Sequence, residues 1–244
     1  MKIIVRTVSA RNVVILLGGP GAGKGTQADP ISEWLGIPHI STGQLLRAEI
    51  GAASELGLRA KALVEAGNLV SDEIVNELVA QRISREDCTG GFLLDGYPRD
   101  VGQAVTLQRN LTANDRLFVV DIEVETEKVT ARLTGRRTCK YCGAIYHMVA
   151  SPPKRAGICN ACGGVLMQRS DDREEVIRER FKIYRDITKP LTEFYRQAGV
   201  YHRIDGMQVP DQVARDIRQV LEKEIVPASP GKMPATAARR LTDV

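Results

Sequence analysis

The sequence predicts an α/β protein: a P-loop three-layer sandwich with a parallel sheet between helices, carrying one helical insertion and one small β-rich insertion. Apolar runs alternate with helical patterns along the chain, which is the order that produces a parallel sheet. The first clear strand, 13–17 (VVILL), is apolar throughout, as strands covered on both faces are. It runs directly into the glycine-rich segment 18–26, GGPGAGKGT.

This glycine-rich segment follows the phosphate-binding loop pattern, with Gly18, Gly23 and Lys24 at the required spacing. Backbone N–H groups can approach a polyphosphate only where side chains are absent, and the following helix adds the positive end of its dipole. We expect Lys24 over the outer phosphates. Because Gly25 directly follows the lysine, the hydroxyl of Thr26 comes one position later than in the general pattern. The alternative is an ordinary glycine-rich turn, which rarely ends in Gly-Lys-Gly-Thr.

The composition is that of a soluble globular chain: 244 residues, 43% hydrophobic, 26% charged, with a net charge of +4. No apolar run approaches the roughly 18 residues that span a bilayer, and the start shows no secretory signal. The basic residues are dispersed, which favours small anionic substrates over a nucleic-acid groove. We therefore expect a cytoplasmic protein without a membrane or nucleic-acid partner.

The spacing of apolar residues and the positions of glycine and proline predict the elements in order. A helix should start near residue 23, although Pro30 should kink or shorten it. A short strand at 39–40 precedes a helix start at 41–43. Further helices are expected at 55–66 (capped by Gly67), 71–84, 126–134, 176–187, 191–197 and 210–224, and strands at 91–95, 116–124 and 200–204. Residues 1–10 stay undecided, and the tail from 226 should be disordered.

The strand at 91–95 (GFLLD) ends in the carboxylate of Asp95, and the next residues are Gly96, Tyr97, Pro98 and Arg99. A carboxylate at the C-terminal end of a parallel strand lies beside the phosphates, where it can hold Mg²⁺ directly or through water. The planar guanidinium of Arg99 can grip a phosphate. A strand end followed by an Asp-Gly turn is the alternative, which the nearby phosphate loop disfavours.

Several arginines surround the predicted insertions: Arg47, Arg99, Arg132, Arg136, Arg169 and Arg180. The arginines near the cysteines flank both ends of the cysteine region, as expected of arginines that bind phosphates from the hinges of an insertion. A solvated charged face explains most arginines in most proteins, and spacing alone leaves both interpretations open.

The cysteines predict a metal site. Cys139-x₂-Cys142 and, sixteen residues later, Cys159-x₂-Cys162 have the spacing of zinc ligands. Four thiolates close the coordination sphere of a tetrahedral ion and leave no position for substrate, so the zinc should be structural. It would let a small β-rich flap fold with little core of its own. Two disulfides are the alternative.

Together these motifs resemble the adenylate kinase family, in its long-lid, zinc-bearing bacterial type, over about residues 12–224. The resemblance rests on GGPGAGKGT, HISTG at 39–43 with Leu46 and Arg47, GFLLDGYPR at 91–99, GRR at 135–137, IYH at 145–147, Arg169, Asp171-Asp172 and Arg180. It implies a core of 1–40, 71–134 and 173–225, a helical insertion at 41–70 that binds a nucleoside monophosphate, a zinc lid at 135–172, and a tail at 226–244. It also implies a monomer.

The resemblance implies roles for individual residues. The lid and loop residues that should bind Mg·ATP are Gly21, Ala22, Gly23, Lys24, Gly25, Thr26, Arg132, Arg136, Ile145, Tyr146 and Gln208. Those that should bind AMP, with the Gln103 amide at the adenine, are Thr42, Arg47, Asn68, Leu69, Val70, Gly96, Tyr97, Pro98, Arg99, Gln103, Arg169 and Arg180. Those that should act on the reacting groups are Lys24, Asp95, Arg99, Arg136, Arg169 and Arg180, and the pair Asp171-Asp172 is a candidate for Mg²⁺ or lid contacts.

The reaction implied is Mg·ATP + AMP ⇌ 2 ADP, by in-line displacement in a closed site from which water is excluded. Two positions depart from the family pattern: Gln44 stands where an aspartate is usual, and Pro30 interrupts the first helix. Three alternatives stay open: a kinase of another nucleoside monophosphate, a zinc-knuckle NTPase that binds nucleic acid, and a nucleotide-binding regulator without activity.

Overall fold

The computed structural model describes residues 10–66 and 68–225, and their fold confirms the predicted parallel α/β class. The expectations for the N-terminal segment before residue 10, the Gly67 cap and the tail from 226 lie outside the described residues. Across the described part of the chain, no helix is both long and apolar enough to cross a membrane.

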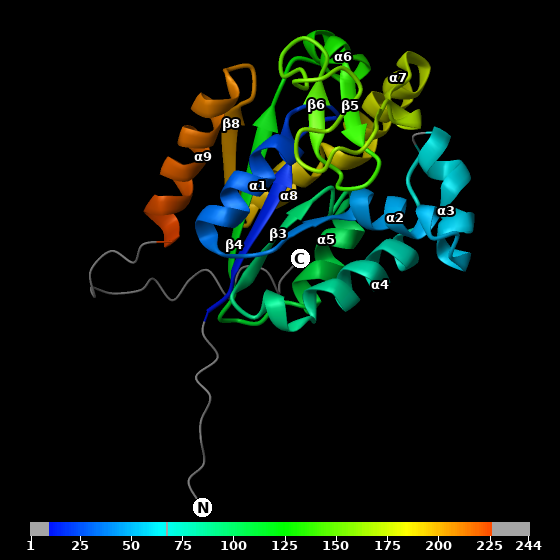
Figure 1. Cartoon of the computed structure of the whole chain (residues 1–244). Coiled ribbons are helices and arrows are strands. Elements are labelled where there is room, and N and C mark those ends of the chain that lie inside the picture. The colour runs from blue at the N-terminus through cyan, green and yellow to red at the C-terminus, as the bar shows by residue number, and fades with distance from the viewer. Residues whose placement is uncertain (1–9, 67, 226–244) are drawn as a thin grey trace, which may run out of the picture.

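The central sheet has five strands in the order β2-β3-β1-β4-β8, and every neighbouring pair is parallel. Figure 1 shows these strands stacked through the middle of the molecule. Their bounds are β1 Asn12–Leu17, β2 His39–Ser41, β3 Gly91–Asp95, β4 Arg116–Glu123 and β8 Tyr201–Asp205.

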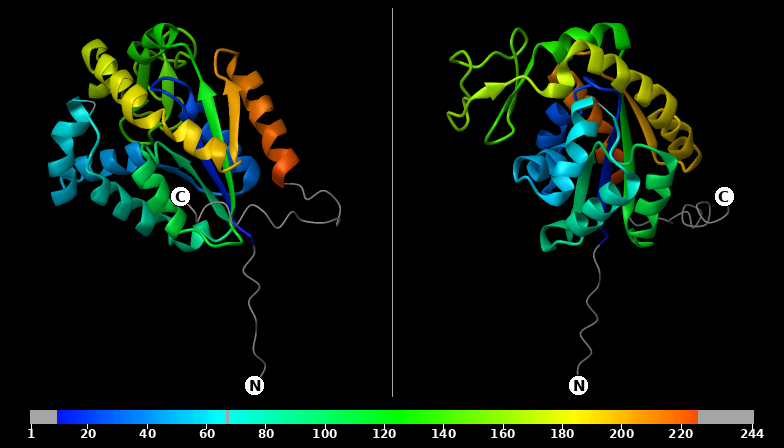
Figure 2. Two further views of the ribbon diagram at one scale, coloured as in Figure 1. Left: turned by 180° about the vertical axis from the view of Figure 1, so that it is seen from behind. Right: turned by 90° about the vertical axis from the view of Figure 1, so that its right-hand side faces the viewer.

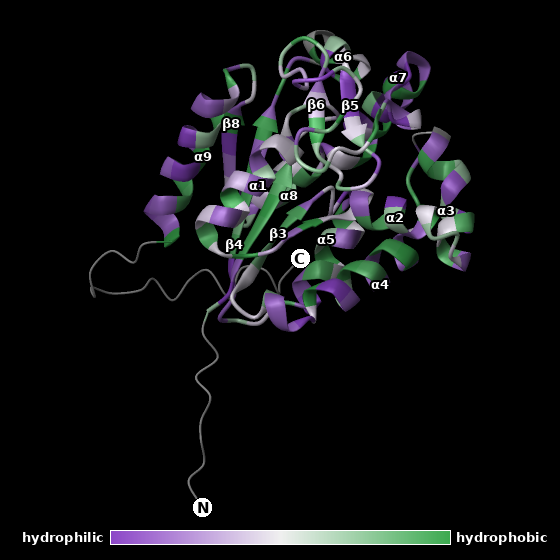
Figure 3. Cartoon of the chain, viewed as in Figure 1, coloured by the Kyte–Doolittle hydropathy of each residue, from purple (hydrophilic) through white to green (hydrophobic). Residues whose placement is uncertain are grey.

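Helices cover both faces of this sheet, because successive side chains of a strand point to opposite faces. Val14 and Leu16 of β1 pack in one apolar cluster with α1 and α9, whereas Val13 and Ile15 pack in the other with α4, α5 and α8. Figure 3 shows the inner strands of the sheet as mostly hydrophobic, the edge strand β8 as hydrophilic, and the outer surfaces of the helices as polar. The bounds are α1 Lys24–Leu35, α4 Asp72–Ile83, α5 Val101–Arg109, α8 Leu191–Gln197 and α9 Pro210–Ile225.

The strand register fixes which residues meet at the edge of the sheet. β1 lies between β3 and β4, and its residue Leu16 pairs with Asp95 while Leu17 pairs with Asp121. On the outer side of β3, Ser41 also pairs with Asp95. Because parallel strands end at the same edge, the glycine-rich loop that follows Leu17 lies beside the carboxylate of Asp95.

The segment after β2 forms two helices that lie over the carboxyl edge of the sheet, α2 (Thr42–Gly51) and α3 (Glu55–Ala66). They pack closely, because Gly57 of α3 lies against the backbone of α2. A Cβ added at Gly57 would overlap the carbonyl group of Glu49. We call these two helices the helical insertion.

The lid is a separate three-stranded antiparallel sheet, in the order β6-β5-β7. It projects from the body of the molecule, as the right-hand view of Figure 2 shows. Its apolar cluster is small and consists of Cys139, Tyr146, Cys159 and Leu166, with Ala144 against it. The bounds are β5 Arg136–Cys139, β6 Ile145–His147 and β7 Leu166–Met167, with α6 Thr126–Thr134 before the lid and η2 Ser170–Asp172 and α7 Glu174–Ile183 after it.

Two local expectations were wrong. Pro30 lies inside α1 but does not shorten it, because the helix continues to Leu35 and ends at a left-handed Gly36. The continuous helix predicted at 176–187 changes to a π-helical turn, η3 (Tyr184–Thr188), after α7. The wider turn alters the helical spacing, and Ile187 is 41% exposed.

Replacing Gly57 by Ala should destabilise the protein by about 1–3 kcal/mol, since the new methyl group forces α2 and α3 apart. Denaturant unfolding measures the change. Gly51→Ala is the matched control, because a Cβ there meets nothing within 4 Å and alanine favours the helix. Equal stability of the Gly57→Ala variant and the parent chain would contradict the close packing of the two helices.

Candidate active site

Two cavities lie at the carboxyl edge of the sheet. The larger, of about 460 Å³, is bounded by the glycine-rich loop and the lid and is lined by Gly21, Ala22, Gly23, Lys24, Gly25, Thr26, Arg132, Arg136, Ile145, Tyr146, Arg169 and Gln208. The smaller, of about 70 Å³, lies against the helical insertion and is lined by Thr42, Arg47, Asn68, Leu69, Val70, Arg99 and Gln103. Arg47, Arg99 and Arg180 line both, so the two cavities meet at a group of cations.

The glycine-rich loop needs its glycines for geometric reasons. Gly23 is the N-cap of α1 with a φ of 95°, a conformation that side chains rarely adopt. Lys24 follows, and its Nζ donates hydrogen bonds to the carbonyl oxygens of Gly18 at 2.6 Å and Gly19 at 3.0 Å. Burial lowers the pKa of Lys24 to about 8. The loop therefore presents a helix N-terminus and a buried lysine to the larger cavity.

The arginines around the cavities are partly buried, and their positive charges repel one another. Burial, with the charges of Arg136 and Arg47 adding to it, lowers the pKa of Arg169 to about 9. Burial also lowers the pKa of Arg47, Arg99 and Arg180, and a neighbouring arginine contributes in each case. Positive charges held this close in a buried space favour a ligand that carries several negative charges between them.

Two neighbouring aspartates hold part of this cationic group in place. Asp172 is fully buried and accepts hydrogen bonds from Arg136 Nε at 2.8 Å, from Arg136 Nη2, and from Arg180 Nη1 at 3.3 Å. Asp171 Oδ2 lies 2.9 Å from Arg180 Nη1. Burial raises the pKa of Asp171, but Arg180, Arg136 and Arg169 outweigh it and hold that pKa below its usual value. Both carboxylate oxygens of Asp172 thus accept hydrogen bonds from arginines, and these bonds connect the lid to α7.

Asp95 lies beside the glycine-rich loop: a Cβ built on Gly25 would lie 3.8 Å from Oδ2 of Asp95. Burial raises the pKa of Asp95, but His39, Lys24 and Arg99 outweigh it, so the net pKa is lowered. An ionised carboxylate here is the kind of oxygen ligand that Mg²⁺ takes beside phosphates. The position of Asp95 therefore fits the predicted magnesium ion.

The turn after Asp95 reaches both cavities, since Gly96 lines the larger one and Arg99 lines both. Thr42 Oγ1 and Arg99 Nε each donate a hydrogen bond of 2.9 Å to the carbonyl oxygen of Gly96. The ring of Tyr97, by contrast, is buried in the core, and its hydroxyl donates to Asn76 Oδ1 at 2.7 Å. The predicted AMP contact of Tyr97 therefore stays a prediction, with the backbone of Tyr97 as the group free to make it. Pro98 lines a third cavity, next to Lys24 and Arg99.

On the lid side, three predicted residues are fixed by contacts of their own. Arg132 Nη1 donates to the carbonyl oxygen of Gly206 at 3.2 Å. Gln208 donates through Nε2 to Asp216 at 2.8 Å. The Tyr146 hydroxyl lies 3.4 Å from Cys159 Sγ. Tyr146 thus connects the wall of the larger cavity to the cysteine cluster.

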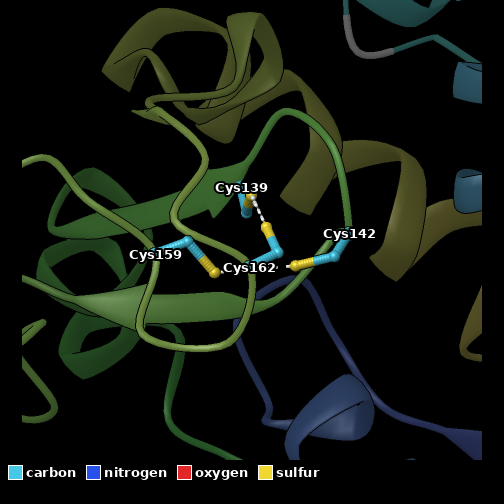
Figure 4. A group of neighbouring side chains, drawn as sticks. All are labelled: Cys139, Cys142, Cys159 and Cys162. Atoms are coloured by element: carbon cyan, nitrogen blue, oxygen red, sulfur yellow. Dashed lines mark hydrogen bonds between the residues drawn. The ribbon is translucent and has the colours of Figure 1, made fainter.

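The sulfur atoms of Cys139, Cys142, Cys159 and Cys162 all lie within 4.8 Å of one another. Figure 4 shows them pointing to a common centre between β5 and the facing loop. Cys139 Sγ is 3.4 Å from Cys162 Sγ, and Cys142 Sγ is 3.6 Å from Cys159 Sγ. With Zn–S bonds of about 2.3 Å, a tetrahedral site places its sulfurs about 3.8 Å apart. The cluster therefore fits zinc, whereas a disulfide needs sulfurs about 2.05 Å apart.

Sequence reasoning missed some residues that act in the site. His39 Nδ1 lies 2.8 Å from Asp29 Oδ1, and its Nε2 lies 3.8 Å from Asp95 Oδ2. The sequence signal was limited to the place of His39 at the start of a short strand, since only the structure shows that this strand lies next to the one that carries Asp95. The helix α5 was also missed, although the sequence offers an N-cap signal in Asp100. The carboxylate of Asp100 accepts a hydrogen bond of 2.8 Å from the backbone N–H of Gln103.

Comparison with known proteins identifies the family. A family model described as "Adenylate kinase" matches residues 16–200. The chain belongs to the adenylate kinase family. The adenylate kinase of Geobacillus sp. is 48% identical over 210 residues, which cover 85% of this chain and 97% of that protein. Those of Archaeoglobus fulgidus and Thermosipho melanesiensis are 45% identical over 212 residues, covering 86% of this chain and 98% and 99% of theirs.

This membership confirms the predicted family and activity. The protein is a nucleoside monophosphate kinase that transfers a phosphoryl group from Mg·ATP to AMP, with ADP as the product. The comparisons do not favour a kinase of another monophosphate or a nucleic-acid-binding NTPase.

The contacts of His39 give a prediction about its titration. Burial lowers the pKa of His39, but the carboxylates of Asp95 and Asp29 outweigh it, so the net pKa is raised. NMR titration of the imidazole should therefore show a midpoint above the ordinary value of about 6.5. Asp95→Asn should lower that midpoint, and replacing the exposed Asp211 by Asn should leave it unchanged. A midpoint at or below the ordinary value would rule out the interaction with Asp95.

Proposed function

We propose that this chain binds ATP in the larger cavity and AMP in the smaller one, with their phosphates facing each other between the two. The observation that carries the proposal is the set of arginines that the two cavities share, Arg47, Arg99 and Arg180. Their lowered pKa values show mutual repulsion and burial, which the phosphates of two nucleotides would offset. A head-to-head arrangement is what phosphoryl transfer in line requires.

In this proposal the protein contributes position and charge. The backbone of the glycine-rich loop and Lys24 hold the ATP phosphates, and Arg132, Arg136, Ile145, Tyr146 and Gln208 enclose the rest of ATP. Thr42, Arg47, the main chain of 68–70 and 96–99, and Gln103 hold AMP. Arg99, Arg169 and Arg180 stabilise the charge that develops on the transferred group. Asp95 would hold the magnesium ion, which neutralises phosphate charge when it is bound with ATP.

We assign the exclusion of water to the two insertions, 41–70 and 135–172. They close over the core, which is formed by 1–40, 71–134 and 173–225. The approach of the two supports this assignment: Gln44 Nε2 would lie 3.9 Å from a Cβ at Gly143 in the lid. Ile145 Cδ1 of the lid would lie 3.3 Å from a Cβ at Gly25 in the loop. We further propose that the enzyme acts as a cytoplasmic monomer without a nucleic-acid or membrane partner.

The lid is proposed to fold around a structural zinc ion bound by its four cysteines. The apolar core of the lid is small, because its buried cluster consists of Cys139, Tyr146, Cys159 and Leu166. Two of these four side chains are themselves proposed metal ligands. Apolar burial of this size stabilises a fold weakly, so the metal–thiolate bonds would add to the stability that the lid gains from its sheet and from the contacts of Asp172.

Replacing Lys24 by Ala should lower kcat for AMP-dependent ADP formation by at least about a hundredfold, because the phosphates lose their buried cation. A coupled assay of ADP production measures the loss. The exposed Lys61 of α3, replaced by Ala, is the matched control and should leave kcat unchanged.

AMP, CMP, UMP and GMP are compared as acceptors, and a preference for UMP would overturn the role of Gln103. Failure of two adenosines joined by five phosphates to bind would overturn the head-to-head arrangement.

Removing zinc with a chelator should lower Tm by about 5–10 °C while changing kcat at 25 °C by less than about threefold. The reason is that the proposed site is closed to substrate and stabilises only the lid. Cys88 lies outside the cluster, so Cys88→Ala provides a matched cysteine control that retains zinc. A chelated enzyme that stays fully folded but loses all activity would contradict a structural role.

A further inference from the structure

The Gln103 side chain is the polar group that the proposed function places at the adenine of AMP. It is almost completely buried, at 2% exposure, and lines the smaller cavity. Its amide is held at both ends: Oε1 accepts from the backbone N–H of Arg99 at 2.9 Å, and Nε2 donates to Asp72 Oδ1 at 2.7 Å. Asp72 comes from a different element, the start of α4.

The backbone of Gln103 is fixed as well. Its N–H donates to Asp100 Oδ1 at 2.8 Å, and its carbonyl oxygen accepts from the Tyr97 hydroxyl at 3.2 Å. The backbone from which the Gln103 side chain extends is therefore held in place. With the amide kept at its observed position, the change left to consider is a half-turn rotation of the amide group about its bond to the rest of the side chain. Such a rotation exchanges oxygen and nitrogen at nearly the same positions.

The two partners of the amide allow one orientation only. The Arg99 backbone N–H is a donor and needs the oxygen, whereas the Asp72 carboxylate is acceptor-only and needs the NH₂ group. In the reversed orientation a donor would face a donor and an acceptor would face an acceptor at the buried Gln103 amide. A hydrogen bond to a charged group is also stronger than a neutral one, so Asp72 provides the larger share of the preference.

We propose that Asp72 is a specificity-determining residue of this enzyme: it fixes the orientation of the Gln103 amide so that the site accepts adenine and rejects a 6-oxopurine. This inference rests on the proposed function, because it deepens the role of Gln103. Asp72 acts through Gln103 and is therefore a positioning residue.

The chemistry of the bases explains the selectivity. With one N–H bonded to Asp72 and one lone pair occupied by Arg99, the amide keeps a second donor and a second acceptor for a ligand. Adenine offers the complementary pair, an acceptor at N1 and a donor at the 6-amino group. Hypoxanthine has nearly the same shape but offers a donor at N1 and an acceptor at O6, which match only the reversed amide. A site built to hydrogen-bond one pattern strongly disfavours the opposite pattern.

The test compares AMP with inosine monophosphate as phosphoryl acceptors. Asp72→Ala should lower the ratio of kcat/KM for AMP over inosine monophosphate by about tenfold, with most of the change in KM, because the amide can then turn. Asp72→Asn should restore most of the ratio, since its side-chain oxygen can accept the same bond. Glu73 is the other acid in the first turn of α4 and, like Asp72, is exposed, so Glu73→Gln is the matched control and should leave the ratio unchanged.

Gln103→Ala separates this inference from the proposed function. If Gln103→Ala leaves the acceptor preference unchanged, the proposed contact between Gln103 and adenine fails. If Gln103→Ala changes the preference but Asp72→Ala lowers kcat/KM for both acceptors equally, the role of Asp72 is structural and the inference alone is overturned. In a Gln103→Ala background, Asp72→Ala should have no further effect on the ratio, whereas an additive effect would contradict action through Gln103.

Discussion

The constraint on which the site depends is the crowding of partly buried positive charges. Lys24, Arg47, Arg99, Arg169 and Arg180 surround two adjoining cavities, and the pKa of each is lowered chiefly by burial. Folding a chain that crowds cations in this way costs free energy, so the rest of the structure must hold them in place. Substrates that bring several negative charges recover part of that cost only when they reach the correct position, which is why charge and alignment act together here.

Three structural features hold these charges. The parallel sheet ends β1 and β3 at one edge, so the loop with Lys24 and the carboxylate of Asp95 are neighbours. Asp172 joins an arginine of the lid to one of α7 inside the protein. The helical insertion supplies Arg47 from a third direction. Each feature depends on long-range packing, and a distortion of any one would move a charge relative to the others.

The sequence predicted the features that depend on local pattern, and it missed those that depend on contacts between distant segments. Glycine spacing and apolar runs were sufficient for the loop, for the strand that ends at Asp95 and for the zinc-type cysteine pairs. The pairing of His39 with Asp95 was missed, because it requires knowing which strands are neighbours. Pro30 was given too much weight, because the cost of one lost hydrogen bond is smaller than the packing of α1 against the sheet.

The central strand carries a further consequence. β1 is hydrogen-bonded along both edges, so its residues cannot slide against either neighbour. One residue inserted or deleted there would move the loop by about 3.3 Å along the sheet and turn the following side chains to the opposite face. Exchanges among valine, isoleucine and leucine leave this register intact, whereas a change in the number of residues does not. The length of β1 is therefore the property that positions the loop.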